Sequence, residues 1–362
     1  MSVKPVRIGI IGCGNISDIY FTNCRKHDIL EVAACADLIP ERAQEKAEKH
    51  GVPRALAVEK LLADKSIELV VNLTIPNAHA QVALAALKAG KSVYNEKPLA
   101  VTREDAQKLI QVAKSKKLLL GGAPDTFLGA GIQTCLKLIR DGWIGEPVAA
   151  AAFMLCHGHE SWHPDPEFYY KAGGGPMFDM GPYYLTALVA LMGPVRRVSG
   201  SARVTFPQRL ITSEPKRGTL IDVDVPTHIA GAMDFQSGAV ATIVTSFDVW
   251  DSTHPYLEIY GTRGSMQLPD PNSFGGPVKI RRSGSAEWSE IPLTHPHADN
   301  SRGVGVADMA TALREGRRHR ANEALTYHVL DIMHAFHDSS AQGQHIDIKT
   351  TCDAPTPMPL DM

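Results

Sequence analysis

The segment Arg7-Ile-Gly-Ile-Ile-Gly-Cys-Gly-Asn-Ile-Ser17 limits most strongly what this chain can fold into. Residues 6–11 are mostly aliphatic, which predicts a strand inside a parallel sheet. Gly12 permits a sharp turn, and Gly14 leaves room for a pyrophosphate to approach the backbone. The helix expected after this turn would point its free N–H groups at that anion. Ser17 takes the place of the third glycine of G-x-G-x-x-G and is small enough for close packing of helix on strand.

An acidic residue follows at the position that this pattern requires. Residues 30–36 predict a second apolar strand, and Asp37 ends it. Its carboxylate is placed to accept hydrogen bonds from an adenosine ribose and to repel a 2′-phosphate, so we expect NAD as the cofactor. Arg42 leaves NADP possible. The alternative is a glycine turn that binds nothing, with Asp37 capping the next helix. The dinucleotide contacts expected in this region are Gly12, Gly14, Asn15, Ile16 and Asp37.

The order of predicted elements indicates two domains. Strands and helices alternate up to about Pro124, which is typical of a doubly wound parallel α/β sheet, the Rossmann domain. Beyond it, helices are expected over 127–140 and 176–192, and residues 195–281 are rich in strands separated by hairpin signals. Consecutive strands with short turns predict an antiparallel or mixed sheet. We therefore expect a dinucleotide-binding domain over 1–124 and a substrate-binding and oligomerisation domain over 125–362.

Composition excludes several classes of function. The 362 residues are 44% hydrophobic and 21% charged with a net charge of −2, as in an ordinary globular protein, and no basic block suggests nucleic acid or a membrane surface. The first predicted strand begins at once, so we expect no signal peptide and a cytoplasmic location. Six cysteines lack paired spacing and are expected to be free thiols. The histidines form no H-E-x-x-H motif, so no metal is expected.

Chemistry is expected at the carboxyl ends of the first domain's strands, where a bound dinucleotide places its nicotinamide. Glu96-Lys97-Pro98 follows one such strand, over 92–94. A lysine there can hydrogen-bond both a ribose and a substrate oxygen. Position alone fits a solvated surface lysine equally well.

The second constellation is Gly173-Gly-Gly-Pro-Met-Phe-Asp179-Met-Gly181-Pro-Tyr183. Three glycines allow a loop to press against a ligand. Asp179 and Tyr183 are four residues apart, so on one helix they would share a face and could act as an acid/base pair. Spacing alone favours a helix cap for Asp179 and core packing for Tyr183.

The glycine fingerprint, Glu96-Lys97-Pro98 and the Gly173–Gly181 motif, in this order, resemble the Gfo/Idh/MocA family of oxidoreductases over nearly the whole chain. The resemblance implies a Rossmann domain followed by an α/β domain with a large open, mostly antiparallel sheet that forms dimers or tetramers. It also implies that Lys97 binds substrate and that the Lys97–Pro98 bond is cis.

One position departs from the commoner family pattern. Many members carry histidine where this chain has Tyr183, and the resemblance then makes Tyr183 the proton carrier, with Lys97 as the cation that makes its hydroxyl more acidic. The catalytic residues expected are Lys97, Asp179 and Tyr183. The further cofactor contacts expected are Thr74, Pro76, Asn77, His79, Glu96 and Lys97. The substrate contacts expected are Lys97, Trp162, His163, Tyr170, Asp179 and Tyr183, where the aromatic residues could equally be core.

These residues predict an NAD(H)-dependent dehydrogenase that acts on a secondary hydroxyl or keto group of a sugar, sugar derivative or cyclitol, in a homodimer or homotetramer. One alternative is a transhydrogenating sugar oxidoreductase that holds NADP tightly. Another is a dinucleotide-binding sensor without turnover, against which the retention of Lys97 and Asp179 argues. Fold alone does not decide among them.

Overall fold

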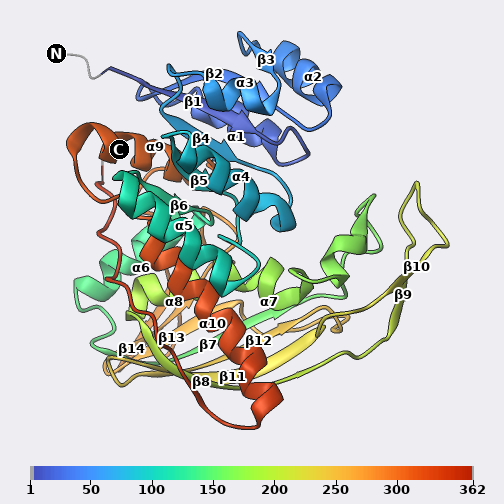
Figure 1. Cartoon of the computed structure of the whole chain (residues 1–362). Coiled ribbons are helices and arrows are strands. Elements are labelled where there is room, and N and C mark those ends of the chain that lie inside the picture. The colour runs from blue at the N-terminus through green and yellow to red at the C-terminus, as the bar shows by residue number, and fades with distance from the viewer. Residues whose placement is uncertain (1–3, 361–362) are drawn as a thin grey trace. The chain divides into compact units, whose positions relative to one another are not determined.

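The computed structural model describes residues 4–360, which form two compact units (Figure 1). The first comprises the chain up to residue 128 together with 300–327, and the second comprises 129–299 and the chain from 328 onward. The sequence-based division had assigned 300–327 to the second domain. In the structure, α9 (Val304–Glu315) packs against α1 (Ser17–Cys24) of the first unit. The Arg314 guanidinium there binds the Glu68 carboxylate at 2.7 Å.

The first unit is built on a six-stranded parallel sheet with the order β3-β2-β1-β4-β5-β6. Its strands are β1 (Val6–Ile11), β2 (Leu30–Ala36), β3 (Ala55–Leu56), β4 (Leu69–Asn72), β5 (Ser92–Asn95) and β6 (Leu120–Gly122). The connecting helices are α1, α2 (Pro40–His50), α3 (Val58–Ala63), α4 (Pro76–Lys88) and α5 (Arg103–Lys116). The chain order reverses where β4 lies beside β1, so the carboxyl ends of these two strands form the switch point at which such sheets bind ligands. The predicted doubly wound sheet is confirmed.

Asp125 fixes the start of α9 within the first unit. Its Oδ2 accepts hydrogen bonds from the N–H groups of Gly303 at 2.8 Å and Gly305 at 3.1 Å. The side chain is buried, and this burial raises the pKa of the carboxyl to about 6, although both N–H donors favour the charged form. The returning segment is therefore anchored by a carboxyl group that titrates at mildly acidic pH.

The Asp125→Asn variant tests this anchor. The folded state holds the Asp125 proton more tightly than an unfolded chain, whose carboxyl pKa is about 4. The contribution of Asp125 to the free energy of unfolding therefore falls as pH rises from about 4 to 6 and stays low above that range. Asparagine keeps an accepting oxygen but does not titrate. We expect the unfolding midpoint of the variant, relative to the wild type, to rise as pH is taken from 4 to 7. A constant difference across this range would contradict the assignment.

The second unit is built on a nine-stranded sheet with the order β16-β15-β14-β13-β7-β12-β11-β8-β17. Its strands are β7 (Pro147–Leu155), β8 (Val195–Arg203), β11 (His228–Phe235), β12 (Val240–Ser246), β13 (Leu257–Gly261), β14 (Gly264–Leu268), β15 (Val278–Arg282), β16 (Ser289–Ile291) and β17 (Ile346–Asp347). The pairing of β7 with β12 is parallel and the other pairings are antiparallel. The expected large, mostly antiparallel sheet is confirmed.

Helices cover one face of this sheet, as Figure 1 shows for α8 and α10. They are α6 (Ala130–Arg140), α7 (Gly175–Asp179), α8 (Gly181–Met192) and the part of α10 (Glu323–Gln342) from residue 328 onward. Phe336 of α10 packs on Gly200 and Gly231, where an added Cβ would lie 2.8 and 2.6 Å from its ring. Among the described residues, no helix combines the length and apolar content needed to cross a membrane.

Candidate active site

Gly12 forms the turn that ends β1. Its φ is +98°, its N–H donates to the Ala36 carbonyl at 2.9 Å, and an added Cβ would lie 2.6 Å from the backbone carbon of Leu73. Only glycine fits both the conformation and the space. At Gly14 an added Cβ would meet nothing within 4 Å, so the outer side of the turn is open. Ser17 closes the turn, since its hydroxyl donates to the Gly14 carbonyl at 2.6 Å.

Asp37 is held against this turn by two backbone donors. Its Oδ2 accepts from the Cys13 N–H at 2.7 Å, and its Oδ1 accepts from the Ile39 N–H at 2.9 Å. The α2 helix itself has no side-chain cap, so Asp37 is not its cap. Each carboxylate oxygen keeps a further lone pair, which leaves the group able to accept from a ribose hydroxyl.

Exposed apolar side chains surround the carboxyl ends of the strands. They are Ile16 at the start of α1, Leu38 and Ile39 after β2, and Ile75 after β4. Leu38 is the most exposed of them, at 93%. Such side chains supply flat apolar contacts for heteroaromatic rings. Together with the open turn at Gly14 and the fixed carboxylate of Asp37, they fit a dinucleotide.

The ends of β4 and β5 are tied by two buried asparagines that the sequence analysis missed. Asn72 and Asn95 are paired in register, and Asn72 donates to the Asn95 side-chain oxygen at 2.9 Å. The Asn72 oxygen accepts from the Thr74 hydroxyl at 2.7 Å, which orients the loop after β4. Beyond it, Pro76 is half-buried and Asn77 is exposed in the first turn of α4. An asparagine at the end of each neighbouring strand is the signal that could have revealed this pair.

His79 supports the two loops and leaves neither ring nitrogen for a ligand. Its Nδ1 lies 2.8 Å from the Pro98 carbonyl oxygen and its Nε2 lies 2.8 Å from that of Thr74. The side chain is buried, and burial lowers the pKa of the imidazole even though both carbonyls favour the protonated ring. The expected cofactor contact is thus corrected to a positioning role.

Glu96 and Lys97 follow β5. The Glu96 carboxylate accepts from the Tyr20 hydroxyl at 2.8 Å and from the Lys97 N–H at 2.9 Å, so α1 and the main chain fix it. Lys97 is half-buried, and its bond to Pro98 is cis, as the resemblance implied. Glu96 is therefore built as a support for the backbone that carries Lys97.

In the second unit the glycine loop is pressed between two segments. An added Cβ at Gly174 would lie 2.5 Å from the Phe168 carbonyl oxygen of η2 (Pro166–Tyr170). At Gly175, where φ is +81°, it would lie 2.9 Å from the Pro226 carbonyl oxygen. Gly174 and Gly175 thus serve close packing of backbone on backbone.

The prediction of a single helix over 176–192 is wrong. Helix α7 ends at Asp179 and α8 begins at Gly181. Pro182 causes the break, because it has no N–H for the Phe178 carbonyl and its ring clashes with that group. Asp179 is the last residue of α7, and Tyr183 lies in the first turn of α8 and is nearly buried.

Asp179 pairs with a histidine that is distant in sequence. The Asp179 Oδ2 lies 3.1 Å from the His159 Nε2. The His159 ring also packs edge-on against Trp162 and lies next to Tyr169, at centroid distances of 5.3 and 4.1 Å. A separation of 20 positions gives no local signal of this pair in the sequence.

Trp162 and His163 belong to the same aromatic cluster. Trp162 is 60% exposed and lies edge-on to His163 at 5.3 Å. The His163 Nδ1 accepts from the Asp165 N–H at 3.0 Å, and burial, with a smaller effect of His159, lowers the pKa of the His163 imidazole. Trp162 therefore offers an accessible ring, and His163 is held neutral behind it.

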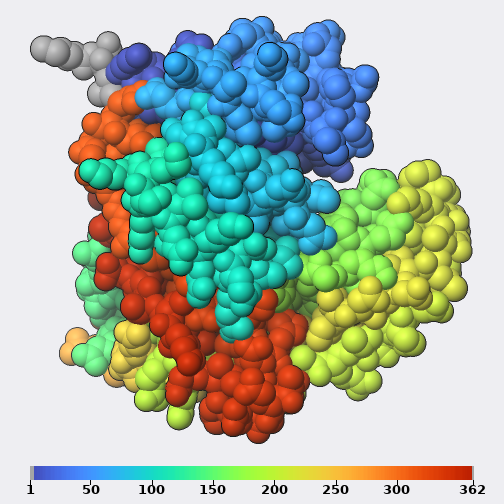
Figure 2. All heavy atoms as spheres, in the orientation of Figure 1, coloured from blue at the N-terminus to red at the C-terminus, as the bar shows by residue number. Residues whose placement is uncertain are grey.

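Tyr170 is corrected from a substrate contact to a support. It is fully buried, and its hydroxyl donates to Glu160. The other Glu160 oxygen binds Arg209 at 2.7 Å, and Arg209 also binds Asp248 and the Phe247 carbonyl. Arg209 lies on the two-stranded arm of β9 (Gln208–Leu210) and β10 (Leu220–Asp222). In Figure 2 the yellow atoms of this arm lie beside the green atoms of the loop that carries His159.

Comparison with known proteins gives the family. Residues 6–122 match the model described as "Oxidoreductase family, NAD-binding Rossmann fold", and residues 132–267 match the "GFO/IDH/MocA C-terminal domain". The chain belongs to the GFO/IDH/MocA family of oxidoreductases. The predictions of the family, of an oxidoreductase and of an NAD-binding domain are confirmed.

Two relatives and one solved structure illustrate the similarity. The chain is 25% identical to myo-inositol 2-dehydrogenase of Thermotoga maritima over 72% of its length and 74% of that protein. It is 28% identical to dTDP-3,4-didehydro-2,6-dideoxy-alpha-D-glucose 3-reductase of Saccharopolyspora spinosa over 85% of its length and 92% of that protein. A structure of levoglucosan dehydrogenase in complex with NADH superposes with a TM-score of 0.83 at 21% identity, covering 96% of this chain and all of that one.

Proposed function

We propose that the protein is an NAD-dependent dehydrogenase that acts on a secondary hydroxyl of a sugar, sugar derivative or cyclitol. The observation that carries the proposal is the turn at Gly12 and Gly14 with Asp37 fixed against it, in a chain that also keeps Lys97 and Asp179. The relatives named for activity on inositol and on a keto-sugar support this substrate class. Asp37 favours NAD because its charge repels a 2′-phosphate.

We assign the cofactor to the first unit and substrate recognition to the second. Gly12, Gly14 and Asp37 would hold the pyrophosphate and the ribose, and Ile16 and Ile75 would contact the rings. When bound, the dinucleotide supplies a hydride acceptor for the carbon that bears the reacting hydroxyl. Trp162 would stack on the apolar face of the sugar ring, as an exposed indole can.

Three side chains would handle the substrate hydroxyl. Lys97 would hydrogen-bond its oxygen and polarise it, and Asp179 would orient it by accepting a hydrogen bond. Tyr183 in its ionised phenolate form, or a water that it orders, would take the hydroxyl proton while the C–H bond gives up its hydride, so that a ketone and one proton result. The reverse direction returns the proton from Tyr183 to the alkoxide oxygen.

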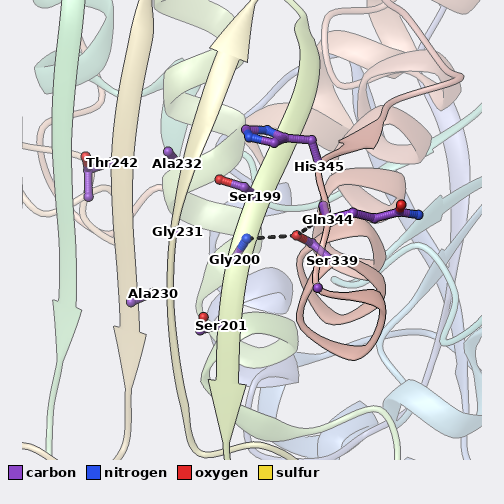
Figure 3. A pocket seen from close by; sticks show the side chains of 11 residues that line it. Ser199, Gly200, Ser201, Ala230, Gly231, Ala232, Thr242, Ser339, Gln344 and His345 are labelled. Carbon is purple, nitrogen blue, oxygen red and sulfur yellow. Dashed lines mark hydrogen bonds between the residues drawn. The ribbon is translucent and has the colours of Figure 1, made fainter.

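We propose that two or four copies associate through the sheet of the second unit. Among the described residues of that unit, the helices lie on one face, and the opposite face carries small side chains such as Ser199, Ser201 and Ala230. These line a depression of about 650 Å³ next to Gln344 and His345 (Figure 3). A sheet face with small side chains allows a second copy to approach closely in a symmetric oligomer. Light scattering is expected to give two or four times the mass of one chain, and the mass of a single chain would contradict this.

We also propose a cytoplasmic location. The six cysteines are free, and five of them are buried, as in a protein kept in a reducing compartment.

The test of the proposed function is the absorbance at 340 nm with a panel of aldoses, glycosides and inositols that includes myo-inositol and levoglucosan, each with NAD and with NADP. We expect NAD to be reduced by one class of sugar. If no sugar of the panel changes the absorbance at 340 nm, while a thermal shift shows that the nucleotide binds, a sensor would be favoured over an enzyme. Nucleotide that copurifies in equal amount with the protein would favour a transhydrogenating oxidoreductase.

A further inference from the structure

The His159 imidazole is held next to the proposed catalytic carboxylate. Its Nε2 lies 3.1 Å from Asp179 Oδ2, and the two side chains are only 11% and 14% exposed. An ionised carboxylate can only accept hydrogen bonds, so the Nε2 of His159 carries the proton and donates it. In this setting, largely shielded from water, a charge-assisted hydrogen bond restricts the carboxylate strongly.

The His159 donor comes from outside the helix that carries Asp179. Asp179 is the last residue of α7, and a helix offers its free N–H groups at the other end. His159 lies 20 positions earlier in the chain, in the loop after β7, and brings its Nε2 to 3.1 Å from the Asp179 carboxylate.

The position of His159 is itself fixed from several sides. The His159 ring packs on Tyr169 and Phe247 at centroid distances of 4.1 and 4.7 Å. The backbone N–H of His159 donates to the Tyr170 hydroxyl at 3.3 Å. The next residue, Glu160, accepts at its carbonyl from the N–H groups of Thr212 and Ser213 at 2.9 and 3.1 Å. Its carboxylate binds Arg209 at 2.7 Å. Ring packing and this anchored backbone leave His159 little freedom to move away from Asp179.

We propose that His159 is a positioning residue, which fixes the Asp179 carboxylate in the orientation that holds the substrate hydroxyl. The inference rests on the proposed function, because it assigns His159 a role through Asp179. His159 need not touch the substrate. It acts by holding the Asp179 carboxylate in one orientation through Oδ2.

Two substitutions at this position separate the hydrogen bond from the packing. The His159→Phe variant keeps a ring against Tyr169 and Phe247 but removes the donor. The His159→Gln variant keeps a donor, since its amide nitrogen reaches about as far as Nε2. With the panel substrate that gives the highest rate, we expect kcat of His159→Phe to fall about 10- to 100-fold, the size of a lost hydrogen bond to a charged partner, with little change in KM. The glutamine variant should recover most of this loss.

The matched control is His254→Phe. His254 also stacks on an aromatic ring of the second unit, Phe153, at 4.4 Å, and it lies on an exposed loop. We expect its kcat to stay within about twofold of the wild type. A rise in KM with unchanged kcat in His159→Phe would overturn the inference, because it would make His159 a binding residue.

Asp179 variants distinguish failure of this inference from failure of the proposed function. If Asp179→Asn keeps full turnover, the catalytic role of Asp179 in the proposed function is wrong. If Asp179→Asn loses turnover but His159→Phe does not, only the inference fails. We expect the variant that combines Asp179→Asn with His159→Phe to have a kcat no lower than that of Asp179→Asn alone, since the effects of substituting residues that act as a unit are not additive.

A readout without substrate completes the test. Nitrogen NMR of the ring in the ligand-free protein at pH 8 should show His159 as a single Nε2–H tautomer. In the Asp179→Ala variant, which lacks the carboxylate, the His159 ring should exchange between the Nε2–H and Nδ1–H tautomers and give an averaged signal. The same averaged signal in the wild type would overturn the pairing.

Discussion

Replacing Lys97 by Met is expected to lower kcat by about 10²- to 10⁴-fold while nucleotide binding is retained. Methionine keeps the length and the apolar stem of lysine but removes the cation that would polarise the substrate oxygen. The backbone at this position is held by Glu96 and by the buried His79, so the loop should keep its shape. Initial rates at 340 nm measure the loss, and calorimetric titration with NAD measures binding.

The control for this variant is Lys108→Met, which changes an exposed lysine on α5 of the same unit. It should leave both kcat and NAD affinity unaltered. Tyr183→Phe should show a loss similar to that of Lys97→Met, because it removes the proposed proton acceptor. Near-normal turnover in Lys97→Met and Tyr183→Phe would remove the proposed mechanism.

Replacing Arg209 by Met is expected to destabilise the second unit by about 3–5 kcal/mol. Arg209 is 4% exposed and neutralises Glu160 and Asp248, which the substitution would leave as buried carboxylates without their cation. The midpoint of thermal unfolding for that unit should fall by about 6–20 °C, at about 2–4 °C per kcal/mol for a domain of this size. Differential scanning calorimetry measures this shift.

Arg196→Met provides the comparison. Arg196 is 60% exposed in its side chain and binds Asp234 at 3.3 Å, so its ion pair is screened by water. Its loss should cost no more than about 1 kcal/mol. Equal shifts for the two arginine variants would show that the buried network around Arg209 does not stabilise the unit as argued.

Much of the first unit could be predicted because its signals are local. The glycine turn, the apolar strand that follows it and Asp37 lie within a short stretch, and each has a specific structural requirement. Hydrophobic runs also predict most strands of both sheets, but not the short strands β3, β16 and β17. Pro182 is also a local signal, because a proline inside a predicted helix predicts the break between α7 and α8.

The remaining features depend on contacts between distant segments. The return of 300–327 to the first unit is fixed by Asp125, which lies 178 positions from Gly303. Likewise, the arm that carries Arg209 holds Glu160 from 49 positions away, and no periodicity encodes such a meeting. Tyr170 and His79 were misjudged for a related reason. Their residue types suit ligand contacts, and only burial shows that they serve as supports.

The most direct test of the central claim follows the hydrogen itself. The panel substrate with the highest rate, deuterated at its carbons, is incubated with NAD and the enzyme. The nucleotide is then recovered and its mass is measured by mass spectrometry. Direct hydride transfer predicts that the reduced nucleotide contains one deuterium derived from the sugar carbon. Reduced nucleotide without deuterium, or no reduction with any sugar of the panel, would contradict it.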